Sequence, residues 1–162
     1  HENNKTVRLQ RRSQGREKMS MTVSINLGDK LKAITSPQAV DSLLRTVAVA
    51  MLGEVKTRIH EDGANAKGSP IGTYSNEYLK RRMKAPYNRT ASRKVILSLT
   101  GQMENDFKVI NLGGSYGLGF SNQFNADKAE WNEERYGKVY ALTPDEQKQV
   151  GLIVTDWVKK NL

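Results

Sequence analysis

The residues best suited to metal chemistry are His60, Glu61 and Asp62, which follow one another directly. Two carboxylates in an ordered site could hold a magnesium ion. Adjacent residues diverge around a helix, however, and the only other histidine is His1. The chain has no cysteine, which excludes a thiol nucleophile and a cysteine metal site. We interpret 60–62 as an ordinary charged helix end, and we expect neither a metal ion nor another cofactor.

Two further stretches could carry catalytic chemistry. Paired carboxylates within 127–134 could act as general acid and base, but Lys128 and Arg135 lie among them. Internal ion pairs on a surface helix are therefore the simpler interpretation. The glycine-rich stretch Gly113–Gly119 lacks the Gly-Lys-Ser/Thr ending and the helix that a phosphate-binding loop needs. These patterns predict a protein that is not an enzyme.

Basic residues gather between 80 and 94 with no acidic residue among them. This basic cluster consists of Lys80, Arg81, Arg82, Lys84, Arg89, Arg93 and Lys94. Such a cluster is typical of a contact with nucleic acid or with the acidic surface of a partner. A solvated loop that keeps the protein soluble is the other interpretation. Tyr87 is the only aromatic residue inside the cluster, which is too few for a base-stacking platform.

The whole chain has 162 residues and a net charge of +9. This length fits one domain with a tail. We assign residues 1–21 to a flexible, disordered basic arm, because Val7 and Leu9 are its only large apolar residues before Met19. The sequence leaves open whether this arm is functional or dispensable. We assign residues 22–162 to a single domain, and no apolar run is long enough to cross a membrane.

Two long amphipathic helices should frame this domain. Ser36 and Pro37 form a helix start, and apolar residues then recur at spacings of three and four up to His60. Residues 143–146 read Thr-Pro-Asp-Glu, a capping box that should open a last helix reaching about Asn161. Shorter helices are expected at 76–83, with Ser75 as cap, and at 125–134, with Trp131 as the large apolar anchor.

Short strands complete the expected fold. The chain alternates apolar and polar residues over 22–27, and residues 107–112 and 115–120 read as a hairpin around Gly113 and Gly114. A further strand is expected at 138–142. Gly117 and Gly119 should leave one face of the hairpin bare for another chain or helix. The predicted class is α+β, with a small antiparallel sheet packed by the long N-terminal and C-terminal helices.

Several stretches resemble one known family. Three stretches carry the resemblance: Gly68–Tyr74 followed by Lys80-Arg81-Arg82, then Leu97–Met103, and then Tyr116–Phe120 with Glu134–Gly137. Their order and spacing resemble those of phage virion morphogenesis proteins. The similarity covers about residues 36–162. Many relatives carry His-Gln-aromatic-Gly where this chain has Glu134–Gly137.

The resemblance implies structural work in a bacteriophage or prophage virion. Members of this family act in tail completion or head–tail joining, assemble as rings, and contact tail, neck or portal proteins. It implies a place in the virion after synthesis in the cytoplasm of the bacterial host, with no catalytic residues and no membrane association. The alternative is a small basic nucleic-acid-binding protein that uses the N-terminal arm and the 80–94 loop.

Overall fold

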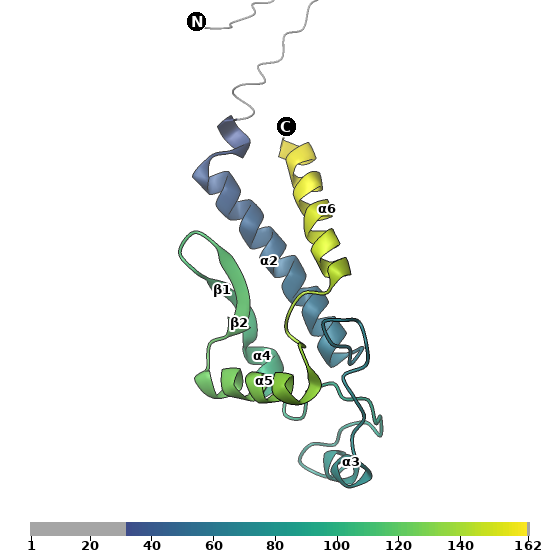
Figure 1. The fold of residues 1–162 in the computed structure, drawn as a ribbon. Coiled ribbons are helices and arrows are strands. Elements are labelled where there is room, and N and C mark those ends of the chain that lie inside the picture. Colours follow the sequence, from purple (N-terminus) through teal and green to yellow (C-terminus); the bar gives the residue numbers. More distant parts are fainter. Residues whose placement is uncertain (1–31, 162) are drawn as a thin grey trace, which may run out of the picture.

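The structure is a computed structural model that describes residues 32–161 (Figure 1). In chain order its elements are α2 (Pro37–His60), α3 (Asn76–Met83), α4 (Gln102–Asp106), β1 (Phe107–Asn111), β2 (Tyr116–Phe120), α5 (Gln123–Tyr136) and α6 (Pro144–Asn161). The α+β class is confirmed. The predicted arm at 1–21 and the predicted strand at 22–27 lie outside the described residues.

Helix α2 has the bounds that its apolar pattern predicts. The Ser36 hydroxyl accepts a hydrogen bond of 3.2 Å from the Ala39 N–H, and Pro37 follows it as the first helical residue. The C-terminal half of α2 is well buried, with Val55 and Ile59 completely inaccessible. The N-terminal half carries no buried side chain before Ala48. One end of this helix therefore forms the core, and the other end projects from it.

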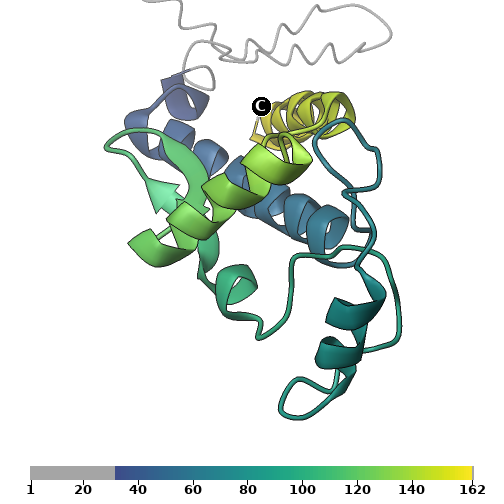
Figure 2. The same cartoon turned by 60° about the horizontal axis from the view of Figure 1, so that its bottom comes forward.

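Helix α6 runs antiparallel to α2 and lies beside it (Figures 1 and 2). Its predicted capping box is confirmed, because the Glu146 N–H donates to the Thr143 hydroxyl over 3.1 Å while the Thr143 N–H donates to Glu146 Oε2 over 2.7 Å. This reciprocal pair satisfies two main-chain donors that the first helical turn leaves without partners. We call α2 and α6 together the helix pair.

The β1–β2 hairpin is also confirmed, with Phe107 opposite Phe120 and Asn111 opposite Tyr116. Within 32–161 these two strands form the only sheet. Helices α2 and α5 both contact β2, the strand that carries Gly117 and Gly119. A Cβ added at Gly117 would lie 3.3 Å from Leu112 Cδ1, and one at Gly119 would lie 3.5 Å from Ile110 Cγ1. In each case the neighbouring atom belongs to a side chain of the hairpin itself.

The core lies where the hairpin meets the C-terminal half of α2. Its buried members are Val55, Ile59, Ile71, Tyr74, Val95, Phe107 and Val139. The ring of Phe107 lies 5.1 Å from that of Phe120 and 5.3 Å from that of Tyr140, which adds favourable aromatic contacts to the area buried. Helix α6 contributes no residue to this cluster, so the core is confined to one end of the helix pair.

The strand expected at 138–142 is absent, and side chains bind its main chain instead. Glu133 Oε1 accepts hydrogen bonds of 3.0 Å from the N–H groups of Val139 and Tyr140. The carbonyl oxygens of Val139 and Ala141 accept from Arg58 over 3.0 and 2.9 Å. These main-chain groups are satisfied without a neighbouring strand, so the apolar segment 139–142 needs no sheet to bury them.

Helix α5 extends the predicted 125–134 segment at both ends and stops at Gly137, whose φ is +77°. The role expected of Trp131 is wrong, because this residue is 57% exposed. The buried side chains of α5 are Asn125 and Ala129, four residues apart on one face. A small face of α5 packs inward, and its largest apolar residue remains at the surface.

Candidate interaction surfaces

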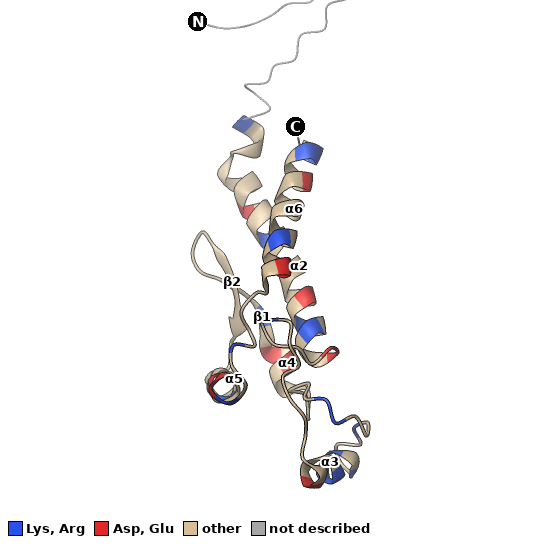
Figure 3. Cartoon of the chain, turned by 45° about the vertical axis from the view of Figure 1, so that its right-hand side comes forward, with Lys and Arg blue, Asp and Glu red and all other residues tan. Residues whose placement is uncertain are grey.

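The basic cluster lies on α3 and on the segment that follows it (Figure 3), and the structure divides it into an exposed and a less exposed part. Lys80, Arg81, Lys84, Arg93 and Lys94 are exposed, whereas Arg82 is buried and Arg89 is half-buried. Helix α3 begins as predicted, with the Ser75 hydroxyl accepting from the Tyr78 N–H over 3.2 Å. The α3 helical turn then points successive side chains in different directions. One run of like charges thus produces two different surfaces.

The two less exposed arginines bind main-chain oxygens of the segment 98–99. Arg82 Nη1 donates to the Ser98 carbonyl over 2.9 Å, and Arg89 Nε donates to the Leu99 carbonyl over 2.9 Å. The exposed Lys94 side chain also reaches a carbonyl, that of Glu61, over 3.3 Å. Part of the basic cluster therefore organises loops of the protein, a role that the composition of the stretch does not reveal.

Arg82 is buried without a carboxylate partner among the described residues. Its guanidinium carbon lies 4.3 Å from the centre of the Tyr74 ring and 5.9 Å from that of Tyr78. These rings and the Ser98 carbonyl partly compensate its charge. Its Nε has no hydrogen-bond partner within residues 32–161. Burying a cation whose hydrogen bonds are incomplete costs free energy of folding. Arg82 therefore differs from an arginine whose only role is to hold the fold together.

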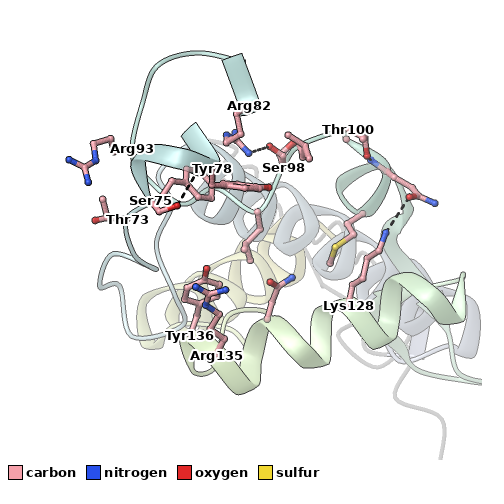
Figure 4. Close-up of a pocket in the computed structure, with 17 residues that line it drawn as sticks. Thr73, Ser75, Tyr78, Arg82, Arg93, Ser98, Thr100, Lys128, Arg135 and Tyr136 are labelled. Atoms are coloured by element: carbon pink, nitrogen blue, oxygen red, sulfur yellow. Dashed lines mark hydrogen bonds between the residues drawn. The ribbon is translucent and has the colours of Figure 1, made fainter. Parts of the chain in front are cut away.

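Arg82 lines a pocket of about 760 Å³ between α3, the segment 93–103 and α5 (Figure 4). We call it the Arg82 pocket. Among residues 32–161, four cationic side chains and no acidic side chain line it: the cations are Arg82, Arg93, Lys128 and Arg135. A concave surface with charges of one sign concentrates the electrostatic potential and attracts ions of the opposite sign.

Lys128 and Arg135 belong to this pocket although the sequence suggested ion pairs within α5. Lys128 Nζ lies 3.4 Å from Gln102 Oε1 and 4.1 Å from the centre of the Phe124 ring, and Arg135 lies against the Tyr136 ring. Neither forms a salt bridge within the described residues. Their spacing of seven residues, which places them on one helix face, is the signal that could have identified them.

A second buried arginine, Arg58, has the opposite environment. Its Nε donates to Glu146 Oε1 over 2.7 Å, and its Nη1 donates to the carbonyls of Ala64 and Val139 over 3.1 and 3.0 Å. Its Nη2 donates to Ala141, as described above. We call these residues the Arg58 cluster. It joins α2, α6 and two loops, and nothing in the local pattern around Arg58 predicts it, because Glu146 lies 88 residues away.

Apolar side chains remain on the outside of several elements. More than two fifths of the surface is exposed at Val40, Val49, Met83, Leu112, Phe124, Trp131 and Leu152. In α6 the apolar stripe is only half-buried, and the sole buried residue of this helix is Glu146. The helix pair therefore has an apolar stripe that the described part of the chain covers incompletely.

Two residues from the stretches considered for catalysis, His60 and Glu133, form hydrogen bonds to neighbouring loops. His60 Nδ1 lies 2.9 Å from the Ile96 carbonyl, so this nitrogen carries the proton, and burial lowers the pKa of the ring. Burial acts to raise the pKa of Glu133, but hydrogen bonds from Lys138 and from the Tyr140 and Val139 N–H groups outweigh it and lower that pKa. Within 32–161, no three metal-ligating side chains gather in one place.

No helix among the described residues has both the length and the apolar character needed to cross a bilayer. Comparison with known proteins found no family model, no curated protein and no solved structure that matches this chain. The interaction surfaces described above are therefore the basis on which a function can be argued.

Proposed function

We propose that this chain is a structural subunit of a bacteriophage or prophage virion. In this role it acts in tail completion or head–tail joining and assembles as a ring with copies of itself. The neighbours in the virion would be tail, neck or portal proteins, and the subunit would be made in the cytoplasm of the bacterial host. The resemblance of segments within 36–162 to virion morphogenesis proteins supports this assignment.

The observation that carries the proposal is the incompletely covered helix pair. An amphipathic helix of 18 residues, α6, contributes no buried apolar side chain, and Leu152 on it is 58% exposed. On α2, Val49 is 55% exposed. Apolar area left at the surface is stabilised when a neighbouring chain removes it from water. This is the property expected of a subunit that completes its packing only in an assembly.

The oligomeric state tests the proposal directly. Size-exclusion chromatography with light scattering, followed by negative-stain imaging, should give a closed ring of many copies or a complex with a tail or portal protein. A protein that stays monomeric at all concentrations and binds none of these partners would contradict the assignment.

Two matched variants connect this test to the helix pair. Ile153→Asp adds a negative charge to the half-buried apolar stripe of α6, whereas Thr155→Asp adds the same charge at an exposed polar position two residues later, on the other side of the helix. We expect the first to shift the population from ring to monomer and the second to leave it unchanged. Equal behaviour of the two variants would show that assembly does not use the α6 stripe.

Nucleic-acid binding is the second candidate function, and the exposed part of the basic cluster favours it. Lys80 and Arg81 on α3 and Lys84 directly after it are exposed to solvent, where they could reach phosphates. Alanine at these three positions should weaken DNA binding and reduce its dependence on salt. Absence of binding at about 50 mM salt would remove this candidate. Arg82 and Arg89 are unsuitable positions for the test because they bond to main-chain carbonyls.

A further inference from the structure

The Arg82 pocket brings together cations from three separate segments of the chain. Arg82 comes from α3, Arg93 from the loop after it, and Lys128 and Arg135 from α5 (Figure 4). Like charges repel, so gathering four of them around one pocket opposes folding unless an anion is present. A glutamate does lie close, since Glu104 Oε2 accepts from the Ser98 hydroxyl over 3.0 Å. It does not line the pocket, and it forms no salt bridge with the four cations.

The guanidinium groups and the apolar side chains of the pocket wall together favour a ligand that carries carboxylates. Guanidinium groups bind carboxylates through pairs of parallel hydrogen bonds, and two of the cations, Arg93 and Arg135, are exposed at the pocket. The wall between them contains apolar side chains as well, among them Leu97, Leu99 and Met103. A peptide in which acidic and apolar side chains alternate would match both the cationic and the apolar parts of this pocket.

The tyrosines of the pocket argue against recognition of bases. Single-stranded nucleic acid binds mainly by stacking on free aromatic faces. Here the Tyr74 ring lies against Arg82 and 5.1 Å from the Tyr78 ring, and Arg135 lies 5.2 Å from the centre of the Tyr136 ring. These rings already contact arginines or each other. Duplex phosphates would meet the exposed cations of α3 and could not reach the buried Arg82.

We infer that the Arg82 pocket binds an acidic peptide segment of another protein, with carboxylates at Arg93, Lys128 and Arg135 and apolar side chains against the segment 97–103. This inference does not depend on the proposed ring, because none of the residues that line the pocket belongs to α6. A monomeric protein that binds acidic peptides would contradict the proposed function and support the inference.

The test measures binding of the full chain to a labelled heptapeptide that alternates Glu and Leu, by fluorescence anisotropy. A peptide with Gln in place of each Glu is the ligand control. The pocket variant is Arg93→Ala with Arg135→Ala, and the matched variant is Lys67→Ala with Lys108→Ala, which removes two exposed positive charges elsewhere. Circular dichroism confirms that both variants fold.

We expect binding of the Glu peptide only, with a loss of about tenfold or more in the pocket variant, because each lost charged hydrogen bond weakens binding about tenfold. The matched variant should stay within about twofold of the unmodified protein. Equal losses in the two variants would overturn the inference, since they would show general charge attraction. So would absence of binding at about 1 mM peptide, or tighter binding of oligothymidylate or inorganic phosphate that the pocket variant abolishes.

Discussion

The protein buries two arginines, and their surroundings differ in almost every respect. Arg58 is 8% exposed and bonds to a carboxylate and three carbonyls. Arg82 is 2% exposed, bonds to one carbonyl and leaves its Nε without a partner. Arg58 lies where two helices and two loops converge, whereas Arg82 lies in the wall of an open pocket lined by further cations.

This difference separates a structural charge from a charge available for binding. A buried ion pair whose lone pairs and protons are all bonded holds its elements in one arrangement, and breaking it is costly. The accessible cations that line the Arg82 pocket have no carboxylate partner among the described residues, so a ligand that supplies carboxylates stabilises the folded protein. The two regions should therefore respond in opposite ways to mutation, with stability lost in the Arg58 cluster and ligand binding lost in the Arg82 pocket.

The largest expected effect is that of Glu146→Ala. This change leaves Arg58 buried without its carboxylate and removes the acceptor of the Thr143 N–H. Breaking one side of a buried pair typically costs about 3–5 kcal/mol in the free energy of unfolding. Urea denaturation followed by circular dichroism measures it. Asp145→Ala, which removes an exposed carboxylate from the neighbouring position, should unfold close to wild type. A small loss at Glu146 would mean that the Arg58 cluster is not the structural centre described above.

The next effect concerns Gly63, which connects the end of α2 to the segment that leads into the pocket. Its φ is +63°, and an added Cβ would lie 2.6 Å from both Lys94 Cδ and the Val95 carbonyl. Gly63→Ala therefore combines left-handed strain with a clash against main chain, and we expect a loss of about 2 kcal/mol or more. The same urea titration applies. Gly68→Ala is a suitable control, because Gly68 also has a positive φ but an added Cβ meets nothing within 4 Å.

Arg82→Met should have a smaller effect, within about 1 kcal/mol of wild type. The variant loses the bond to Ser98 and the contact with Tyr74, but it also removes the cost of burying a charge that has no carboxylate partner. The informative quantity is the difference between the losses in free energy of unfolding caused by Arg82→Met and by Glu146→Ala. A loss as large as that at Glu146 would place both arginines in the same structural class and weaken the case for the pocket.

The smallest effect is expected at Asp106, a charge that hydrogen bonds compensate at an exposed site. Hydrogen bonds from Ser121, Asn125 and the Asn122 N–H lower the pKa of its carboxyl to about 2 from an ordinary 3.8. A lowered folded-state pKa gives stability above the unfolded value that is lost as the pH falls through the folded value. The small stability advantage over Asp106→Asn should therefore disappear between pH 3.8 and about 2. An advantage that does not change with pH would contradict this assignment.

The local pattern was sufficient for most elements, and it failed where distant groups decide. The caps at Ser36, Ser75 and Thr143 involve bonds across three residues, so they can be read from neighbouring letters. The strand expected at 138–142 is replaced by bonds from Arg58 and Glu133. Trp131 lies outside because α5 packs through its small face. Neither outcome follows from hydrophobic periodicity. Periodicity shows which face of an element is apolar, but not which part of the protein packs against that face.

The candidate site was predictable only in part for the same reason. The sequence placed Arg82 and Arg93 in a basic cluster but could not divide that cluster into exposed, carbonyl-bound and pocket-lining members. For Lys128 and Arg135 the sequence favours ion pairs within 127–135, because nearby acids in the chain are the partners that sequence alone can offer. In the folded protein these two face the pocket instead.

The sequence by itself determined the two long helices, their caps, the hairpin and the excess of positive charge, because these depend on residue types a few positions apart. The tertiary structure alone decided which arginine is neutralised. Arg58 meets Glu146 across 88 residues, while Arg82 meets tyrosines, a carbonyl and other cations. The energy of a buried charge depends on the atoms packed around it, and only the fold brings those atoms together.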